Sequence, residues 1–281
     1  MSAQIIDGFE IARQVREDVA KQTASLKEKG ITPCLAVILV GENPASVSYV
    51  TGKEKALAEV GMADRSIRLP ENTTEDELLK IIDELNHDKT VHGILVQLPL
   101  PKQINEEKVI MAISPEKDVD GFHPVNIGKI MQGVGGIAPC TPKGVMTILD
   151  ELGIDIEGKN AVVIGRSIIV GRPMASLLLN KGATVTICHS KTKDLKEHTK
   201  NADILVVAVG KPHLVTADMV KENAVVIDVG INRIDGKLIG DVDTENVSKK
   251  AKYISPVPGG VGLTTVYTLM ENVVELAEKS K

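Results

Sequence analysis

The sequence predicts an α/β protein of two domains: a small α/β substrate domain and a Rossmann-type nucleotide-binding domain, with an active-site cleft between them. Short apolar runs alternate with helix-type patterns along nearly the whole chain, which is typical of parallel α/β architecture. A segment rich in Gly and Pro, residues 114–140, separates an earlier group of these runs from a later one. The length of 281 residues suits one large domain or two of medium size.

The composition narrows the class of protein. Hydrophobic residues make up 43% of the chain and charged residues 25%, both ordinary for a soluble globular protein. A net charge of -5 and an aromatic content of 2% argue against nucleic acid as the main partner. No apolar run reaches the roughly 20 residues that span a bilayer, and the N-terminus lacks a signal-peptide pattern. We therefore expect a cytoplasmic protein without a membrane segment.

The cysteines and histidines carry no metal or disulfide signature. Cys34 and Cys188 lie in apolar runs, so we expect buried, reduced thiols, with a catalytic thiol as the alternative. The six histidines form no HExxH motif or other recognisable ligand cluster. We predict no structural or catalytic metal.

The first group of elements begins with a helix over residues 9–29, ended by Gly30. Its apolar stripe contains Ile11, Val15, Val19 and Leu26. The apolar run 34–41 predicts a strand buried on both faces. Pro44 suits the first turn of the next helix, which ends near Gly61.

A second strand over residues 66–69 precedes another helix, for which Thr74 and Glu77 form a capping box. Residues 93–98, GILVQL, predict a third buried strand that contains Gln97. Residues 114–140 predict a loop region and a domain junction. Thr141 is then the expected N-cap of the following helix.

The second group contains four apolar runs, which predict strands over residues 160–165, 183–190, 202–210 and 224–230. A last helix starts near Thr264, beyond this group, and we expect it to complete the first domain. The predicted domains are therefore 1–140 together with 264–281, and 141–263.

The turn GRSIIVGRPM follows the strand at 160–165. Gly165 and Gly171 are placed as in a Rossmann turn, where glycine lets the backbone approach a pyrophosphate at a helix N-terminus. The spacing GxSxxxG departs from GxGxxG, so a turn that only packs a helix onto a sheet is the alternative. The next strand ends at Ser190 without the acid that binds the ribose of NAD. With Arg166 in the turn, this favours NADP.

Tyr49 and Lys53 stand four residues apart after the first strand, and therefore share one helix face. A solvated lysine and a core ring are the ordinary interpretations of these two residues. Gln97 lies within an apolar run, where an unpaired amide costs about 1–3 kcal/mol, so a partner is expected. Gly52 either permits close approach of a ligand or is neutral. Asp118 is interpreted as a turn-former.

Six stretches, found in the order below, resemble the bifunctional methylenetetrahydrofolate dehydrogenase/cyclohydrolase family over residues 6–275. They are VGENPASVSYVTGKEKA, GILVQLPLP, PEKDVDGFHP, GRSIIVGRPM, DVGINR and PVPGGVGLTTV. The resemblance implies oxidation of 5,10-methylenetetrahydrofolate with NADP, followed by hydrolysis to 10-formyltetrahydrofolate. It also implies a homodimer in one-carbon metabolism and purine biosynthesis.

The same resemblance implies roles for individual residues. Lys53 is the essential lysine, Gln97 positions it, Asp120 binds the pterin, and Tyr49 is the ring beside the folate. Residues implied for the folate loop are Pro258, Gly259 and Gly260. Residues implied for the cofactor are Gly165, Arg166, Ser167, Gly171, Ser190 and Ile231.

Two departures and two rival functions accompany this resemblance. Ile168 stands where a polar residue is expected, and Leu263 and Thr264 replace a more usual Pro-containing pair. One rival is another two-domain NADP-dependent dehydrogenase of the shikimate or amino-acid type, although the GRS turn differs from a GxGGxxR-like turn. The other is a non-catalytic nucleotide or folate sensor, which would not need Lys53.

Overall fold

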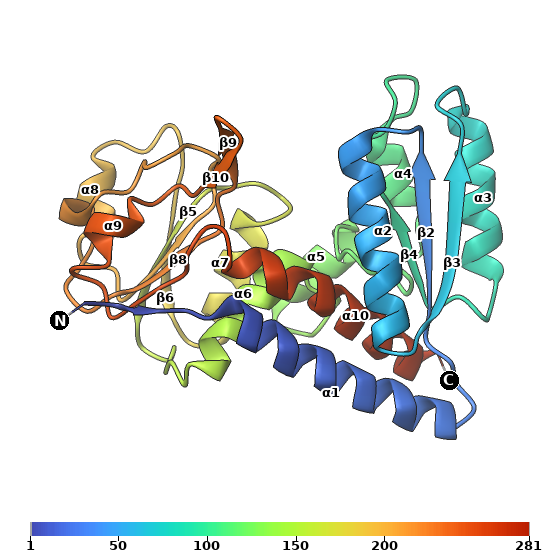
Figure 1. Cartoon of the computed structure of the whole chain (residues 1–281), viewed down its shortest axis with the longest axis horizontal. Helices are drawn as coiled ribbons and strands as arrows, with labels where there is room; N and C mark the ends of the chain where they lie inside the picture. Colours follow the sequence, from blue (N-terminus) through green and yellow to red (C-terminus); the bar gives the residue numbers. More distant parts are fainter. Residues whose placement is uncertain (1, 281) are drawn as a thin grey trace. The chain divides into compact units, whose positions relative to one another are not determined.

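The computed structural model describes residues 2–280 and divides the chain into two compact units (Figure 1). The Rossmann unit comprises residues up to Arg13, then Ile130–Val134 and Thr141–Thr265. The three-stranded unit comprises Gln14–Lys129, Gly135–Cys140 and the chain from Val266 onward. Met1 and Lys281, which the predicted domain boundaries include, lie outside the described residues. The predicted class of two α/β domains with parallel sheets is confirmed.

The three-stranded unit is built on a parallel sheet of order β3-β2-β4 (Figure 1). Its strands are β2 (Cys34–Val40), β3 (Ala63–Leu69) and β4 (Gly93–Val96). Every residue of β2 is buried, so both faces of this central strand are covered, as its unbroken apolar run predicts. Successive side chains of a strand point to opposite faces, and alternate residues of β2 enter one core cluster with α3 and α4.

Helices connect and follow these strands. Helix α2 (Pro44–Glu59) joins β2 to β3, α3 (Glu75–His87) joins β3 to β4, and α4 (Glu106–Ala112) follows β4. The predicted capping box is confirmed: Glu77 N–H donates to Thr74 Oγ1, and Thr74 N–H donates to a Glu77 carboxylate oxygen. Pro44 lies in the first turn of α2, as predicted.

Two long helices and two shorter ones include residues of both units. Their bounds are α1 (Gly8–Glu28), α5 (Pro124–Gln132), α6 (Cys140–Glu151) and α10 (Val261–Lys279). The predicted stripe of α1 is buried at Ile11, Val15, Val19 and Leu26. From Val266 onward, α10 belongs to the three-stranded unit, where the Asn272 side-chain amide donates to the carbonyls of Val119 and Ala138.

The Rossmann unit has a six-stranded parallel sheet of order β1-β11-β8-β7-β5-β6. Its strands are β1 (Gln4–Ile5), β5 (Asn160–Ile164), β6 (Thr184–Cys188), β7 (Ile204–Val207), β8 (Val225–Asp228) and β11 (Tyr253–Ile254). The chain runs from β5 outward to β6 and then returns past β5 to β7, so the strand order reverses beside β5. At such a reversal, ligands bind beyond the carboxyl ends of the strands.

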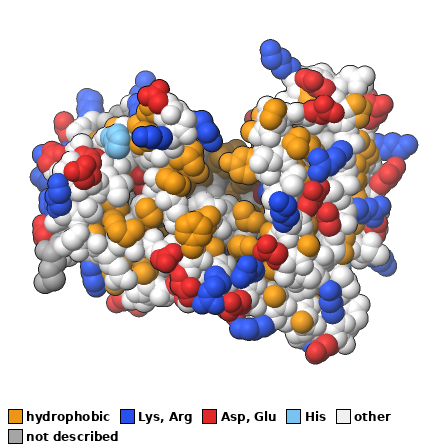
Figure 2. Space-filling view, viewed as in Figure 1, with side chains coloured by type: hydrophobic (Ala, Val, Ile, Leu, Met, Phe, Trp, Pro, Cys, Tyr) orange, Lys and Arg blue, Asp and Glu red, His pale blue; other side chains and the backbone are white. Residues whose placement is uncertain are grey.

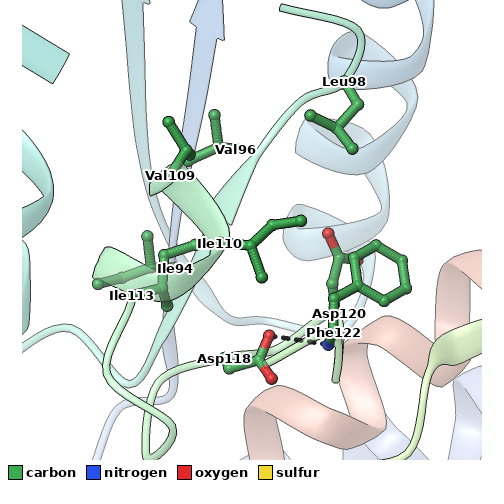
Figure 3. A pocket seen from close by; sticks show the side chains of 9 residues that line it. All are labelled: Ile94, Val96, Leu98, Val109, Ile110, Ile113, Asp118, Asp120 and Phe122. Carbon is green, nitrogen blue, oxygen red and sulfur yellow. Dashed lines mark hydrogen bonds between the residues drawn. The ribbon is translucent and has the colours of Figure 1, made fainter. Parts of the chain in front are cut away.

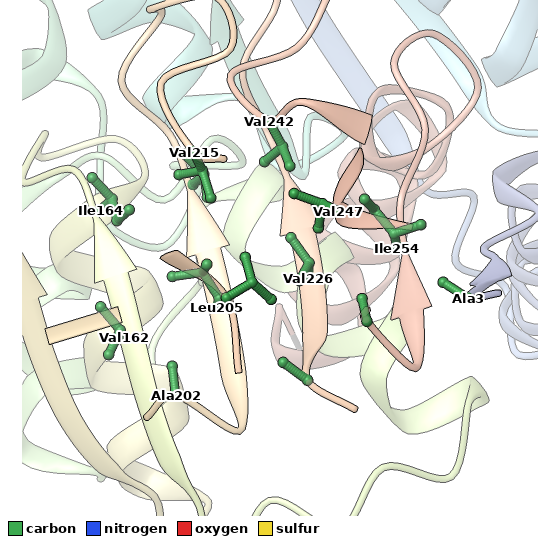
Figure 4. Close-up of a cluster of buried hydrophobic side chains, with 14 of the residues drawn as sticks. Ala3, Val162, Ile164, Ala202, Leu205, Val215, Val226, Val242, Val247 and Ile254 are labelled. Atoms are coloured by element: carbon green, nitrogen blue, oxygen red, sulfur yellow. The ribbon is translucent and has the colours of Figure 1, made fainter. Parts of the chain in front are cut away.

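Helices and a small hairpin complete the Rossmann unit. They are α7 (Gly171–Asn180), α8 (Leu195–Thr199), the 3-10 helix Ala217–Met219, α9 (Thr244–Val247), and the antiparallel pair β9 (Asn232–Ile234) and β10 (Lys237–Ile239). The core on one face of the sheet is formed by small and β-branched side chains from the central strands and the segments above them (Figure 4).

Some local predictions were wrong. Gln97 follows β4 rather than lying inside it, because the strand ends at Val96. Thr141 is inside α6, which begins at Cys140. The predicted loop region 114–140 contains α5, whose glycine and flanking prolines suggested a loop. The strands β1, β9, β10 and β11 were not predicted, because segments of two or three residues carry no readable periodicity.

Surface charge and helix composition indicate whether nucleic acid or a membrane is a partner. Figure 2 shows Lys and Arg side chains interspersed with Asp and Glu over the visible face of each unit, without a continuous basic patch there. Among residues 2–280, no helix combines the length and the apolar character needed to cross a bilayer.

Candidate active site

A hydrogen bond joins Lys53 on α2 to Gln97 after β4. Lys53 Nζ donates to Gln97 Oε1 at 2.9 Å, and both side chains are partly buried. Each residue is held by its neighbours in the sheet: α2 follows β2 after a short turn, and Gln97 N–H donates to Ile38 O at 2.9 Å. The partner expected for the amide of Gln97 is therefore Lys53.

The orientation of the Gln97 amide is also fixed. Its Nε2 donates to Leu98 O at 2.8 Å, which leaves Oε1 as the end that faces the lysine. A lysine amine can make more than one hydrogen bond, and Gln97 accepts one from Lys53. This bond sets the direction of the amine and leaves it able to contact a ligand. The ordinary interpretation of Lys53, a freely solvated helix lysine, does not describe this geometry.

Asp118 organises the loop that follows α4. Its carboxylate is buried and accepts hydrogen bonds from the N–H groups of Phe122 (3.2 Å) and His123 (2.9 Å), and from Asn126 Nδ2 (2.8 Å). Residue 118 also forms a parallel bridge with Ile94 of β4. The turn-forming role predicted for Asp118 is confirmed, and the loop that carries Asp120 is fixed against the sheet.

Asp120 differs sharply from Asp118, although it lies only two residues away. No described residue donates a hydrogen bond to its carboxylate, and its side chain remains partly accessible. Burial raises the pKa of Asp120 to about 6; the positive charge of Lys53 opposes this rise, and the negative charge of Asp118 adds to it. The carboxylate of Asp120 is thus an unused acceptor near Lys53.

A largely apolar pocket lies beside Asp120 (Figure 3). It is lined by Ile94, Val96, Leu98, Val109, Ile110, Ile113, Asp118, Asp120 and Phe122. Apolar walls with a few polar groups are characteristic of small-molecule sites. Of these lining residues, only Asp120 is predicted from the sequence to bind a ligand.

Tyr49 lies one helical turn before Lys53 on α2 and is 63% exposed. The alternative of a core ring is therefore wrong. A large exposed ring on the helix that carries Lys53 is available to contact a flat ligand.

The glycine turn of the Rossmann unit is packed against its surroundings. Gly165 has φ +133°, and an added Cβ would lie 2.4 Å from Ala208 O. A Cβ on Gly171 would lie 2.2 Å from Gly165 O. Both glycines are therefore required by the turn itself, which is also what the packing alternative predicts. The turn lies against the loop that follows β7, beside the reversal of strand order.

Ser167 caps α7 from within the same turn. Its Oγ accepts hydrogen bonds from the N–H groups of Val170 (3.1 Å) and Gly171 (3.3 Å), and its carbonyl accepts one from Arg172 N–H. Pro173 has no N–H, so the first amides of α7 already have partners. The helix dipole still favours an anion there, and the exposed Arg166 supplies a positive charge.

The remaining predicted cofactor residues are accessible. Ser190 is exposed just after β6, which ends without an acidic residue, and Ile231 is 58% exposed after β8. The turn, the cation and the missing acid together fit NADP: glycine permits a close turn, and nothing acidic at the end of β6 repels a 2′-phosphate.

Pro258, Gly259 and Gly260 lie in the Rossmann unit, between β11 and α10. Gly259 has φ +102°, and its carbonyl accepts a hydrogen bond from Gly8 N–H at 3.1 Å. A Cβ on Gly260 would lie 2.5 Å from Pro256 O. This loop is therefore tightly folded rather than a plain flexible linker.

Within the part of the chain that the structure describes, no group of three or more His, Cys, Asp or Glu side chains is placed to hold a metal ion.

Two family models match this chain. The profile "Tetrahydrofolate dehydrogenase/cyclohydrolase, catalytic domain" matches residues 6–120. The profile "Tetrahydrofolate dehydrogenase/cyclohydrolase, NAD(P)-binding domain" matches residues 139–281. The chain belongs to the tetrahydrofolate dehydrogenase/cyclohydrolase family. The family predicted from the six sequence stretches is confirmed.

Individual relatives are similar to this chain over nearly its full length. The chain is 59% identical over 281 residues to the bifunctional protein FolD of Ligilactobacillus salivarius, covering 100% of this chain and 99% of the relative. The crystal structure of the bifunctional enzyme FolD from Campylobacter jejuni superposes with a TM-score of 0.96 at 53% identity, covering 99% of both chains. The Trypanosoma brucei enzyme, solved with NADP and an inhibitor, has a TM-score of 0.92 at 39% identity, covering 100% of this chain and 99% of that one.

These comparisons settle the function at the level of the family. The chain is an NADP-dependent methylenetetrahydrofolate dehydrogenase and a methenyltetrahydrofolate cyclohydrolase, as predicted. Shikimate dehydrogenase from Thermus thermophilus is only 16% identical, with a TM-score of 0.52, so it shares the fold alone. The rival dehydrogenase is not favoured.

Gly52 offers a first test of the surface around Lys53. An added Cβ at this helix position meets no atom within 4 Å. Because glycine inside a helix is roughly 0.5–1 kcal/mol less favourable than alanine, we predict that Gly52→Ala raises the free energy of unfolding by about that amount. Chemical denaturation measures this change.

The same variant should leave the KM for folate within twofold of the unmodified enzyme. A large rise in that KM would show that a ligand approaches the backbone at position 52. In that case, the glycine would be retained for binding rather than as neutral variation.

Proposed function

We propose that Lys53, Gln97, Asp120 and Tyr49 form the folate site in which both reactions of this enzyme occur. The hydrogen bond between Lys53 and Gln97, close to the unpaired carboxylate of Asp120, carries this proposal. A structural lysine would more simply pair with a carboxylate, as Arg68 does with Glu54 on the same helix. Lys53 instead donates to a neutral amide, which directs the amine.

The first reaction removes a hydride from a carbon that lies between two nitrogens. Those nitrogens stabilise the resulting cation, so this step needs no general base. When bound, NADP supplies a nicotinamide that accepts the hydride. The task of the protein is therefore to position the reacting carbon, and Asp120 and Tyr49 serve that task by binding the two rings of the folate.

The second reaction adds water to this cation and opens the five-membered ring, which requires proton transfers. We assign these transfers to Lys53. A cationic intermediate beside the amine favours the neutral form of lysine, which can take a proton from the attacking water. The protonated amine can then return the proton to the departing ring nitrogen. Gln97 keeps the amine in one direction throughout.

Asp120 is proposed to bind the pterin. A carboxylate can accept a pair of parallel hydrogen bonds from adjacent N–H groups, as it does from a guanidinium. Its protein neighbours leave these acceptor positions open, whereas those of Asp118 are already used. Tyr49 is proposed to lie against the aminobenzoyl ring, where offset or edge contact is favourable. The loop Pro258–Gly260 is proposed to contact the same substrate.

The cofactor residues are assigned within the Rossmann unit. We propose that Gly165 and Gly171 shape the turn that NADP approaches, and that Arg166 and Ser190 meet its 2′-phosphate. Ser167 maintains the turn by capping α7. Ile231 offers an exposed apolar side chain to the nicotinamide end.

Three broader expectations remain proposals. We propose that the predicted domain 1–140 with 264–281 binds folate and that 141–263 binds NADP, except that residues up to Arg13, Ile130–Val134 and residues 264–265 lie in the Rossmann unit. We also propose that the enzyme is a cytoplasmic homodimer whose product serves purine biosynthesis, as the family resemblance implies. Light scattering coupled to size-exclusion chromatography measures the oligomeric state directly.

The assignment of Lys53 predicts a separation of the two activities. Lys53→Met should lower the cyclohydrolase rate at least about a hundredfold, because proton transfer by a positioned group contributes roughly that much or more. Hydride transfer should fall less, since it needs no general base. The assay mixes protein, tetrahydrofolate, formaldehyde and NADP, and follows NADPH and methenyl absorbance.

Lys55 provides the matched control. It is an exposed lysine two residues further along α2, so Lys55→Met removes the same charge without touching Gln97. This control should keep both rates within twofold. Equal losses in the two variants, or an unchanged cyclohydrolase rate in Lys53→Met, would remove Lys53 from the chemistry.

Asp120 predicts a pH dependence of folate binding. Its pKa is raised to about 6, so the carboxylate is charged above that pH and becomes neutral as the pH falls through it. The KM of the cyclohydrolase reaction should therefore rise about tenfold between pH 7 and pH 5. Asp120→Asn should have a high KM that no longer varies over this range. A KM that still rises with the same midpoint in Asp120→Asn would assign the titration to another group.

A further inference from the structure

The loop that follows β7 is wrapped around a buried carboxylate. Asp241 is 0% exposed, and its Oδ2 accepts hydrogen bonds from Val209 N–H (2.7 Å) and Gly210 N–H (2.9 Å). Its Oδ1 accepts from Lys211 N–H (2.7 Å) and from Asn232 Nδ2 (3.0 Å). Three successive backbone amides thus point at one anion, an arrangement that in other proteins binds phosphate. Here the anion belongs to the protein.

Asp228 ties Asp241 to the end of β8. Its Oδ1 accepts from Asp241 N–H (3.0 Å) and Gly230 N–H (2.9 Å), and its Oδ2 accepts from Val242 N–H (2.8 Å). The two acids leave no space around them, because a Cβ on Gly230 would lie 2.1 Å from Asp241 Cγ. Likewise, a Cβ on Gly240 would lie 2.0 Å from Asp228 Oδ2.

These carboxylates lie at the carboxyl ends of β7 and β8, the edge of a parallel sheet at which ligands bind in folds of this class. The loop 208–211 follows β7 and packs on the glycine turn, since the missing Cβ of Gly165 accommodates Ala208 O. The β8 end held by Asp228 leads into Ile231. Strands β5 and β7 flank the reversal of strand order, where a dinucleotide lies beyond the carboxyl ends.

We propose that Asp241 is a positioning residue for NADP, which fixes the loop 208–211 against the glycine turn so that the dinucleotide finds a preformed site. It acts through backbone amides and does not itself touch the cofactor. Asp228 supports it by holding the backbone of residue 241. This inference rests on NADP binding by the Rossmann unit and adds the groups that shape the site.

Asp241→Asn is the sharpest variant, because it keeps the shape of the side chain but gives one of its two oxygens to an amino group. That amino group cannot accept the hydrogen bonds that reach one side of the carboxylate, and the loss of charge weakens those on the other side. Calorimetric titration of the purified protein with NADP, without folate, should show a dissociation constant raised at least tenfold.

The cyclohydrolase reaction supplies an internal reference, because it consumes no NADP. Its kcat and KM for the methenyl substrate should stay within twofold in Asp241→Asn, while the KM for NADP in the dehydrogenase reaction rises. Asp243→Asn is the matched control. Asp243 lies two residues away and caps α9 through Asn246, so its substitution should leave NADP affinity unchanged.

An unchanged dissociation constant in folded Asp241→Asn would overturn the proposal. An equal loss with Asp243→Asn would also overturn it, because it would indicate a general weakening of the unit. Failure of the unmodified enzyme to bind NADP would instead contradict cofactor binding itself.

If Asp241→Asn does not fold, Asn232→Ala tests the same cluster more gently, because it removes one of the four donors to the Asp241 carboxylate, together with the hydrogen bond from Asn232 to Ile239 O. NADP affinity should then fall about threefold. An unchanged affinity in Asn232→Ala would count against the proposal.

Discussion

Parallel pairing of the strands is the constraint on which both units depend. When neighbouring strands run the same way, their carboxyl ends lie along one edge, and each connection must return along a face of the sheet. In the three-stranded unit, that edge brings α2 with Lys53 next to Gln97, although 44 residues separate them in sequence. In the Rossmann unit, it brings the glycine turn after β5 against the loop after β7. Each group of candidate residues follows from strand direction more than from any single motif.

The buried or partly buried carboxylates of Asp118, Asp120 and Asp241 are of two kinds: those that accept hydrogen bonds from protein N–H groups, and one, Asp120, to which no described residue donates. Asp118 and Asp241 are saturated by backbone amides and neighbouring side-chain amides, which lowers the cost of burying a charge. Asp120 has no such donors among the described residues, and burial raises its pKa to about 6. A partly buried acid without a donor is costly to the free protein. A ligand with N–H groups would recover this cost, so the distinction separates residues that build the site from Asp120, the residue proposed to bind the substrate.

The sequence predicted most of the architecture, because long elements have strong periodicity. The stripe of α1, the unbroken apolar run of β2 and the capping box of α3 each determine their own element locally. The pairs β1–β11 and β9–β10 were missed because such short strands exist only through their partners. The sequence predicts Gln97 inside a strand because apolar residues stand on both sides of it, so the end of β4 at Val96 has no signal in the sequence. The contact between Lys53 and Gln97 was expected from the family resemblance, since spacing along the chain could not show it.

The roles of Asp118 and Asp241 could not be separated from ordinary turn chemistry at the level of sequence. Asp241 directly follows Gly240 and Asp118 lies three residues before Gly121, and an acid near a glycine commonly closes a turn. Nothing in the surrounding sequence indicates how many amides donate to each carboxylate. Both acids differ from ordinary turn-forming acids in the number of N–H groups that donate to each carboxylate. Asp241 is also packed so closely that a Cβ on Gly230 would overlap it, and only the folded backbone determines these features.

The two activities also place different demands on the fold. Hydrolysis of the methenyl cation requires proton transfer and substrate positioning, which the proposed residues of the three-stranded unit supply. Oxidation additionally requires the glycine turn and the loop after β7 to be preformed for a dinucleotide. Among the described residues, the carboxylate–amide cluster around Asp241 and the Lys53–Gln97 pair have no hydrogen-bond partner in common. Because sites without shared partners usually contribute independently, hydride transfer can be weakened through the second cluster while the hydrolytic step keeps its own chemistry.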